Sequence, residues 1–335
     1  MLPLESRRDM KIYTFENRTI DIRAYSSAGG LFTALAEIVL NKGGVVYGAS
    51  FDEDWSVVHR RIDNVADICH LRGSKYVFTD INGCFSQVCA DLKDGRTVLF
   101  SGTPCQIAAV RKKFGYHENI LLVEVVCHGA PKKEYWSLYL DELLKNQGKT
   151  QDEIASINFR DKTKGWKNYS VCVEFKGGSR FIQNHRDNLY IQAFVHDYTL
   201  REGCTKCPFK NPNSKADISM GDFWGIEALA PNIDNNLGTT IAIADTAKGE
   251  SILDSIACRT YFSVEQVAQY NPAIVKSPSV PLDKPEFDTT VKAEGFHYAA
   301  AKFLKPVFDS RDRKMSFRNQ LRSFIYRVYS FIKNR

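Results

Sequence analysis

Two cysteines three positions apart form the strongest chemical signal in the sequence, within Cys204-Thr205-Lys206-Cys207-Pro208. Two thiolates with this spacing on one turn bind one metal ion or two corners of an iron–sulfur cluster, and Cys-Pro commonly ends the ligand loops of such clusters. One pair cannot complete a tetrahedral or cubane site. The sequence therefore has to supply further ligands from elsewhere.

Two more cysteines follow segments that are expected to be buried strands. Cys105 lies in the segment 101–106 (Ser-Gly-Thr-Pro-Cys-Gln), and Cys127 begins Cys127-His128-Gly129. Ligands of open parallel sheets bind at the carboxyl ends of the strands, so we expect both cysteines near that edge. Thr103 can cap the helix that follows, and the free N–H groups of its first turn favour a thiolate at Cys105.

The spacing by itself leaves several kinds of site open. Cys105, Cys127, Cys204 and Cys207 suit a four-thiolate cluster, and they equally suit a structural zinc site. The further alternatives are a dithiol redox pair formed by Cys204 and Cys207, and two unrelated buried cysteines. The remaining cysteines lie in helical or strand patterns and are expected in the core, where a free thiol packs as a small apolar group: Cys69, Cys84, Cys89, Cys172 and Cys258.

Two glycine-containing turns have the composition of a phosphate or cofactor site. Ser27, Gly29 and Gly30 precede a helix expected to end near Leu40, where hydroxyl and N–H groups can hold a phosphate at the positive end of the helix dipole. An ordinary serine cap is the alternative. The segment 72–76 (Arg-Gly-Ser-Lys-Tyr) contains two cations, a hydroxyl group and an aromatic ring, which could bind an anionic flavin or its phosphates. The alternative is that this segment is a solvent-exposed loop without a ligand.

The order of the predicted elements indicates an α/β fold. Buried strands are expected at 45–51, 97–101 and 120–126 with helices between them, which is typical of a largely parallel sheet. Residues 154–160, 169–175 and 180–183 alternate as antiparallel strands, with Gly177-Gly178 at a hairpin turn. We therefore expect a mixed, largely parallel core with helices and a smaller antiparallel, β-rich insertion.

These elements predict three segments along the chain. Residues 1–150 are expected to form an α/β region that carries the candidate flavin turns, residues 151–285 a β-rich region whose cysteine pair completes the four-cysteine site, and residues 286–335 the C-terminal helices with a basic amphipathic tail.

The composition restricts where the protein works. A chain of 335 residues with 44% hydrophobic residues can fill a core, and no apolar run reaches the roughly 18–20 residues of a membrane span. The start has no pattern of a secretory signal, and nine cysteines suit a reducing compartment. We expect a cytoplasmic protein.

The net charge of +6 does not indicate nucleic-acid binding, because it comes from the C-terminal tail. Residues 311–335 hold eight Lys or Arg and one Asp, so the rest of the chain is close to neutral. At helical spacing the apolar residues of this tail share one face, which suits a helix at the inner membrane surface or one that packs on the protein itself. These residues are Phe317, Leu321, Phe324, Ile325, Val328, Phe331 and Ile332.

Taken in order, several segments make the sequence resemble the β subunits of the coenzyme F420 hydrogenase/dehydrogenase family. The resemblance runs from about Tyr25 to Glu227 and more loosely to Lys276. The motifs that carry it are 26–32, 43–49, 71–76, 101–106, 127–129, 157–162 with Gly165-Trp166, the Cys204/Cys207 pair, and 221–225.

The resemblance implies a subunit that holds FAD and a 4Fe-4S cluster and passes electrons between a deazaflavin, coenzyme F420, and iron–sulfur partners. It implies cluster ligation by Cys105, Cys127, Cys204 and Cys207. It also implies that a set of polar and glycine residues surrounds the flavin: Ser27, Gly29, Gly30, Arg72, Gly73, Ser74, Lys75, Tyr76, Thr103 and Gln106.

The sequence departs from the family at two points. Many relatives begin with a ferredoxin-like module, whereas no cysteine here precedes Cys69, so we expect a separate ferredoxin-like or iron–sulfur partner. Ala28 stands where the family often has serine. Some relatives act where deazaflavin is absent, so a redox enzyme of envelope polysaccharide synthesis is a second interpretation, and a non-catalytic Cys₄ zinc interaction module is a third.

Overall fold

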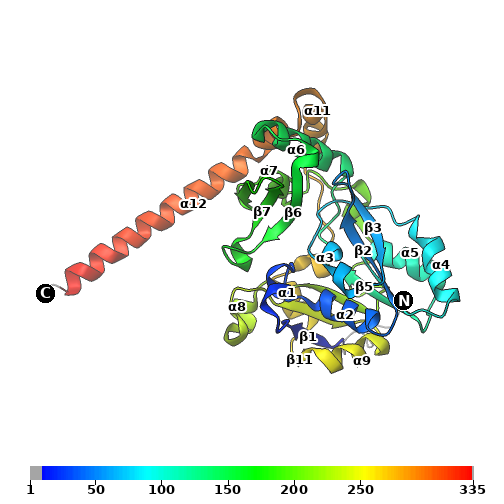
Figure 1. Ribbon diagram of the computed structural model, residues 1–335. Coiled ribbons are helices and arrows are strands. Elements are labelled where there is room, and N and C mark those ends of the chain that lie inside the picture. The colour runs from blue at the N-terminus through cyan, green and yellow to red at the C-terminus, as the bar shows by residue number, and fades with distance from the viewer. Residues whose placement is uncertain (1–9, 334–335) are drawn as a thin grey trace.

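An eight-stranded sheet forms the centre of the protein (Figure 1). The computed structural model describes the backbone of residues 10–333, and the side chains of these residues except 313 and 316–333. The strands follow one another across the sheet in the order β11 (Cys258–Thr260), β1 (Ile12–Phe15), β10 (Thr240–Ala244), β9 (Ile218–Asp222), β5 (Ile120–Val125), β4 (Val98–Gly102), β2 (Val45–Phe51) and β3 (Val57–Ile62).

The centre of this sheet is parallel and its two sides are antiparallel. Strands β2, β4, β5 and β9 pair in parallel, while β3 on one side and β10, β1 and β11 on the other pair antiparallel. Strand β4 is buried along its whole length, as a strand covered on both faces must be. The mixed α/β fold predicted from the sequence is confirmed, and its parallel part is the centre of the sheet.

Helices cover both faces of the sheet because alternate strand residues point to opposite sides. Leu99 of β4 packs with Leu35 of α2 (Leu31–Leu40) on one face, and α3 (Ile68–Leu71) and α9 (Ala247–Ile256) lie on the same side. Phe100 packs on the other face against α4 (Cys84–Lys93) and α5 (Pro104–Phe114). Helix α5 begins with the predicted cap, since Thr103 and Gln106 form a reciprocal capping box.

A separate three-stranded antiparallel sheet contains β6 (Ile154–Asp161), β7 (Ser170–Phe175) and β8 (Arg180–Asn184). It packs with α6 (Lys133–Gln147), α7 (Leu189–Val195) and α11 (Lys284–Glu294) around an aromatic core that includes Trp136 and Tyr190. The antiparallel insertion predicted from the sequence is therefore confirmed. Short helices complete the chain: α1 (Ile20–Ala24), α8 (Ile226–Leu229) and α10 (Val264–Ala268).

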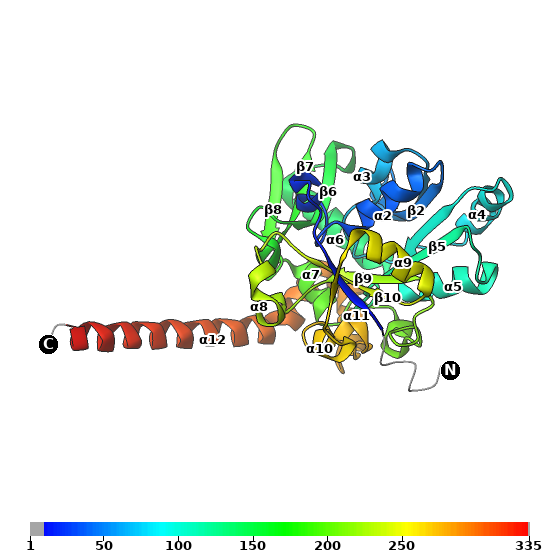
Figure 2. The ribbon, with the colours of Figure 1, turned by 90° about the horizontal axis from the view of Figure 1, so that it is seen from below.

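The last helix, α12 (Phe296–Lys333), begins inside this aromatic core and then extends away from the rest of the molecule in both views (Figure 1, Figure 2). The predicted apolar face of the tail, from Phe317 to Ile332, lies on side chains outside the described ones. Within the described part of the chain, no helix has the length and apolar character needed to cross a membrane.

The sequence pattern also indicates strands at 56–62, 216–220 and 239–244, which correspond to β3, β9 and β10, but it did not predict β1 and β11. β1 and β11 are short, and each finds its partner more than 200 residues away, since β1 pairs with β10 and β11. As a result, β9, β10 and β11 complete the sheet that the N-terminal third of the chain begins. The division into segments at residues 150 and 285 stays a prediction.

Candidate functional site

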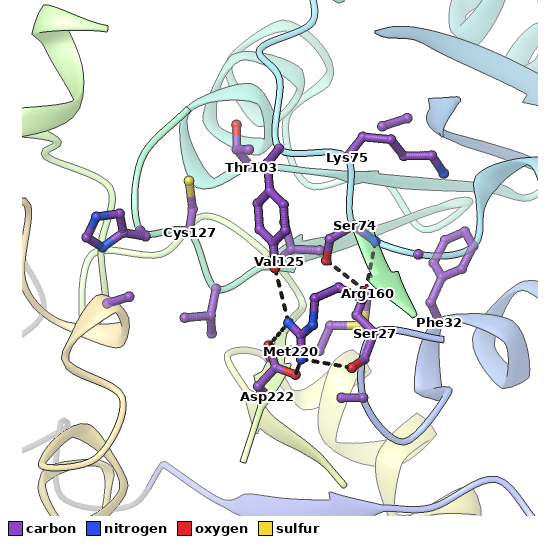
Figure 3. Close-up of a pocket in the computed structure, with 18 of the residues that line it drawn as sticks. Ser27, Phe32, Ser74, Lys75, Thr103, Val125, Cys127, Arg160, Met220 and Asp222 are labelled. Atoms are coloured by element: carbon purple, nitrogen blue, oxygen red, sulfur yellow. Dashed lines mark hydrogen bonds and ion pairs between the residues drawn. The ribbon is translucent and has the colours of Figure 1, made fainter. Parts of the chain in front are cut away.

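A cavity of about 510 Å³ lies between the carboxyl ends of the parallel strands and the end of β6 (Figure 3). Its volume falls in the range of roughly 300–1,000 Å³ that small-molecule and cofactor sites occupy. Val125 ends β5 and Met220 lies within β9, whereas Ser27, Lys75 and Arg160 come from loops and from the small sheet. This is the sheet edge at which the sequence predicted a ligand.

The first predicted turn reaches the cavity through Ser27 and Gly30. Gly30 has a φ of +88°, a backbone conformation that favours glycine, and it precedes the first residue of α2. Gly29 has a different task, because it does not line the cavity. A Cβ atom on Gly29 would lie 2.0 Å from the carbonyl oxygen of Phe15, so glycine is needed there for the turn to lie against β1.

The second predicted loop, residues 72–76, is hydrogen-bonded directly to the first. The hydroxyl groups of Ser27 and Ser74 lie 2.7 Å apart, and the backbone N–H of Ser74 donates to Ser27 Oγ at 2.7 Å. Arg72 Nε donates to Thr33 Oγ1 of α2 at 3.1 Å. The two segments that the sequence predicted separately therefore form one wall of the cavity.

Lys75 is held by its own loop. Its amine donates to the carbonyl oxygens of Arg72, at 2.9 Å, and His70, at 3.1 Å. Burial, together with the positive charge of Arg60, lowers the pKa of Lys75 to about 7. An anionic ligand in the cavity would favour the protonated form of this lysine.

Arg160 connects the walls of the cavity, and the sequence prediction did not include it among the site residues. Its guanidinium forms two hydrogen bonds with the carboxylate of Asp222, at 3.0 and 3.1 Å, and donates to Ser27 O at 3.2 Å and Tyr76 Oη at 3.1 Å. Figure 3 shows Arg160 between Asp222 and Ser27. Burial by itself would lower the pKa of Arg160, but Asp222 raises it well above its usual value.

The sequence contained a signal for this pair. Arg160 and Asp222 both lie in motifs dense in aromatic, charged and glycine residues, at 157–162 and 221–225, but nothing in those motifs shows that they meet. In the structure Trp166 Nε1 also donates to Asp222 Oδ1 at 3.0 Å, and the Trp166 ring stacks on Trp224 with 4.6 Å between ring centroids. Both motifs therefore serve the cavity.

Lys162 is hydrogen-bonded to the glycine-containing turn that carries Ser27, Gly29 and Gly30. Its amine donates to the carbonyl oxygens of Arg23, Ala28 (3.0 Å) and Leu237 (2.9 Å). Burial and the nearby guanidinium of Arg160 lower the pKa of Lys162 to about 7. This contact fixes the turn that carries Ser27.

Thr103 and Gln106 line the cavity as predicted, and they also have local structural tasks. The side-chain oxygen of Gln106 accepts from the Thr103 N–H at 2.9 Å, and its amide nitrogen donates to Thr79 O at 2.7 Å. They therefore fix the start of α5 against the loop after Tyr76. Cys105 lies in the first turn of α5 and is exposed, with its sulfur 3.3 Å from Thr103 Oγ1.

Three of the four predicted cysteines, Cys127, Cys204 and Cys207, lie on two loops that are hydrogen-bonded to each other, and Cys105 lies in the first turn of α5. The loop after Cys127 runs beside residues 199–204, since Arg201 N donates to Ala130 O at 3.1 Å and Ala130 N donates to Cys204 Sγ at 3.4 Å. Burial raises the pKa of Cys127 to about 12, with smaller contributions in the same direction from Cys105, Cys204 and Cys207. The hydrogen-bonded loops therefore place Cys127 and Cys204 near each other.

These sulfurs do not form a ready-made metal site. Among the described residues, no group of three or more His, Cys, Asp or Glu side chains has the arrangement needed to hold a metal ion. Of the four cysteines, Cys127 also lines the large cavity, so the cysteine group adjoins the cavity through it.

The other cysteines follow the sequence prediction only in part. Cys84 and Cys172 are buried, as expected, and Cys89 is half-buried. The prediction was wrong for Cys69 and Cys258, which are exposed. A helical or strand pattern shows that a residue lies in an element, but a single cysteine does not show which face it occupies.

Comparison with known proteins identifies the family. A family model for the C-terminal part of the beta subunit of coenzyme F420 hydrogenase/dehydrogenase matches residues 95–270, a little over half of the chain. The chain therefore belongs to this family, as the sequence motifs predicted, and its role is in redox chemistry.

A solved structure shares the fold. The protein is similar to a chain of the F420-reducing NiFe hydrogenase complex from Methanosarcina barkeri, with a TM-score of 0.53 and 16% sequence identity, over 85% of this chain and 93% of that chain. At this identity the similarity shows the fold alone. No curated protein sequence matches the chain.

Proposed function

We propose that the protein is an FAD- and 4Fe-4S-dependent oxidoreductase that passes electrons between a two-electron carrier of the deazaflavin type and a separate iron–sulfur protein. One observation carries the proposal: Cys127 lines the cofactor-sized cavity, and the loop that follows it is hydrogen-bonded to the loop that carries Cys204 and Cys207. A flavin in the cavity and an iron–sulfur cluster at the cysteines would therefore be neighbours, with Cys127 between them.

The residues around the cavity fit a flavin dinucleotide. Ser27, Gly30 and Ser74 offer hydroxyl and N–H groups at the start of α2, where an anion is favoured, and Lys75 adds a cation. A Cβ atom at Gly30 would lie 3.2 Å from Asn17 Cβ and 3.3 Å from Ser26 Oγ, so the turn has little room for a side chain. In the proposal these residues bind and orient the pyrophosphate.

The cysteine group fits an iron–sulfur cluster by its donor chemistry. Four thiols supply the ligand set of a cubane cluster, and three of them lie on loops rather than inside strands or long helices. Cys105, Cys127, Cys204 and Cys207 would be the ligands. A bound flavin exchanges a hydride with the two-electron carrier and releases single electrons, and a cluster accepts them one at a time.

Cofactor analysis tests the proposal directly. Anaerobically purified or reconstituted protein should contain about four irons and one FAD per chain, with the absorption of both groups. Cys127→Ser and Cys204→Ser should lose most of the iron, whereas Cys172→Ser, a change at a buried cysteine in β7, should retain it.

Three results would point elsewhere. Stoichiometric zinc without iron would contradict the proposal and favour a Cys₄ interaction module. Protein that takes up no flavin would contradict the use of the cavity. Retention of both cofactors without any reaction with coenzyme F420 would favour a redox enzyme of envelope polysaccharide synthesis.

We also propose that the protein works in the cytoplasm, with its basic C-terminal segment at the inner membrane surface. The support is the excess of Lys and Arg in residues 311–335 and the way α12 leaves the rest of the molecule in both views (Figure 1, Figure 2). Cations near an anionic lipid surface each add about 1 kcal/mol of attraction.

A further inference from the structure

Tyr169 lies directly before β7 and lines the large cavity, and the redox proposal above does not use it. Only 8% of its surface is exposed. Within the described part of the chain, no residue forms a hydrogen bond with its hydroxyl group. This group is also not one of the buried polar atoms that the protein seals off without a partner, so it is open to the cavity.

The other buried tyrosines of the described chain all have a partner for their hydroxyl group. Each bonds to a carboxylate, a backbone carbonyl or a side-chain amide: Tyr13, Tyr47, Tyr135, Tyr139, Tyr190 and Tyr198. A phenol hydroxyl that is removed from water normally finds such a partner, because leaving it unpaired costs free energy. Tyr169 is the exception, and the cavity is the place from which its partner can come.

The ring of Tyr169 is held in one position. The imidazole of His185 stacks on it with 4.1 Å between ring centroids, and the central carbon of the Arg160 guanidinium lies 4.2 Å from the ring centroid. One face of the ring has room for only one of these groups, so together they cover both faces. His185 is fixed in turn, because its Nδ1 donates to Tyr169 O at 2.9 Å. A ligand therefore meets a hydroxyl group that is already ordered.

Tyr76 brings a second phenol hydroxyl to the same guanidinium. Its oxygen accepts from Arg160 at 3.1 Å, and among the described residues nothing accepts its own proton. Linked hydrogen bonds polarise one another, so the guanidinium makes the Tyr76 hydroxyl a better donor. Burial raises the pKa of Tyr169 well above its usual value, so that hydroxyl keeps its proton at neutral pH. Two donors that lack an acceptor therefore lie around Arg160.

The surroundings of these donors favour an uncharged acceptor. The charge of Arg160 is balanced by Asp222, with 3.0 Å between nitrogen and oxygen. The ring of Trp224, which also lines the cavity, lies 5.3 Å from the Arg160 guanidinium and adds apolar surface. A phosphate group is better served by the glycine-containing turn and Lys75. A carbonyl oxygen on a planar ring fits both the donors and the aromatic wall.

We propose that Tyr169, together with Tyr76, binds a carbonyl oxygen of a flavin-type ring. The inference rests on the proposed FAD-dependent function and adds the end of the cavity at which the ring lies. Flavins and deazaflavins share the carbonyl groups of a pyrimidine-dione, so the ring belongs either to FAD or to the two-electron carrier. Arg160 is a positioning residue, because its Nη atoms already donate to oxygens of the protein.

Tyr169→Phe tests the inference, because it removes the hydroxyl group and keeps the ring. The affinity of the cofactor-free protein for FAD, measured by flavin fluorescence, should fall about threefold to tenfold, as for the loss of one uncharged hydrogen bond. The affinity for ADP, which has the pyrophosphate and lacks the flavin ring, should not change in a calorimetric titration. Tyr116→Phe, at an exposed tyrosine outside the cavity, is the matched control and should bind FAD like the wild type.

Urea denaturation of the cofactor-free protein separates binding from packing. The Tyr169 hydroxyl bonds to nothing in the described protein, so Tyr169→Phe should keep the midpoint of the wild type. Tyr139→Phe should lower the midpoint, because it removes a partner of the buried Asn188. A decrease of equal size in Tyr169→Phe would show that its hydroxyl serves the fold, and would overturn the inference.

Coenzyme F420 distinguishes the two possible rings. Weaker binding of FAD, with an unchanged dissociation constant of F420 for the FAD-loaded variant, assigns the carbonyl oxygen to FAD, and the reverse result assigns it to the carrier. Equal affinities of Tyr169→Phe and the wild type for both molecules would overturn this inference alone. So would an equal loss of FAD and ADP affinity. Wild-type protein that binds no FAD would instead refute the proposed function, and this inference with it.

Discussion

Replacing Arg160 by methionine tests whether this residue holds the candidate site together. The change removes both bonds to Asp222 and those to Ser27 O and Tyr76 Oη, and it leaves Asp222 without its cation. The Arg160 side chain is only 3% exposed and that of Asp222 19%. Removing one partner of a buried ion pair costs about 3–5 kcal/mol, since the other charge is left uncompensated.

A loss of this size is a large part of the roughly 5–15 kcal/mol that stabilises a folded domain. It should appear as a lower midpoint in urea denaturation of the cofactor-free protein, with an unchanged slope. Arg160→Lys should lose less, because it keeps a charge for Asp222, but lysine cannot reproduce the fork that also reaches Ser27 and Tyr76.

The matched control is Arg180→Met. Arg180 pairs with Glu174 on the same small sheet, but the Arg180 side chain is 55% exposed and that of Glu174 35%, so this change should move the midpoint little. Without urea, where the Arg160→Met variant is folded, FAD binding should still be weaker than in the wild type. The reason is that the variant lacks the hydrogen bond from Arg160 to Ser27 O, which fixes the turn. Equal midpoints for Arg160→Met and Arg180→Met would refute the reasoning.

Three further outcomes are expected. Gly29→Ala should destabilise the protein by about 1–3 kcal/mol in thermal or urea denaturation, because its Cβ would lie 2.0 Å from Phe15 O, whereas Gly177→Ala, in open space, should not. Burial lowers the pKa of Lys75 to about 7, so its charge is complete below that pH and fades above it. FAD affinity, measured by flavin fluorescence, should therefore weaken as the pH rises through 7, and Lys75→Met should remove this dependence. The full chain should co-sediment with anionic vesicles at low salt and a chain ending at Ser310 should not; equal recovery of both in the supernatant would assign the tail another role.

Local chemistry made part of the fold predictable. The buried run of β4 and the capping box at Thr103 and Gln106 depend on residues next to one another in the chain, so the sequence alone shows them. The same holds for the hairpin between β7 and β8, where Gly178 has a φ of +81°. By contrast, β1 is four residues long and both strands that pair with it lie beyond residue 239, so its own pattern carried too little signal.

The candidate site divides in the same way. The cysteine spacing, the glycine turn and the loop of Arg72 to Tyr76 are contiguous motifs, and the residues of the turn and the loop line the cavity with the exception of Gly29. Their family was recognisable from the order of the motifs, and the match over residues 95–270 confirms it. Which residues hold the cofactors stays a prediction.

The sequence by itself determined the ingredients of this protein: an α/β core, a redox family, and the thiols, cations and glycines that its chemistry uses. Tertiary structure decided their relations. Arg160 meets Ser27 across 133 residues and Asp222 across 62, and Lys162 meets the carbonyl of Ala28 across 134. Such contacts depend on how the two sheets pack, and no local pattern encodes that packing, because it arises from the burial of side chains contributed by the whole chain.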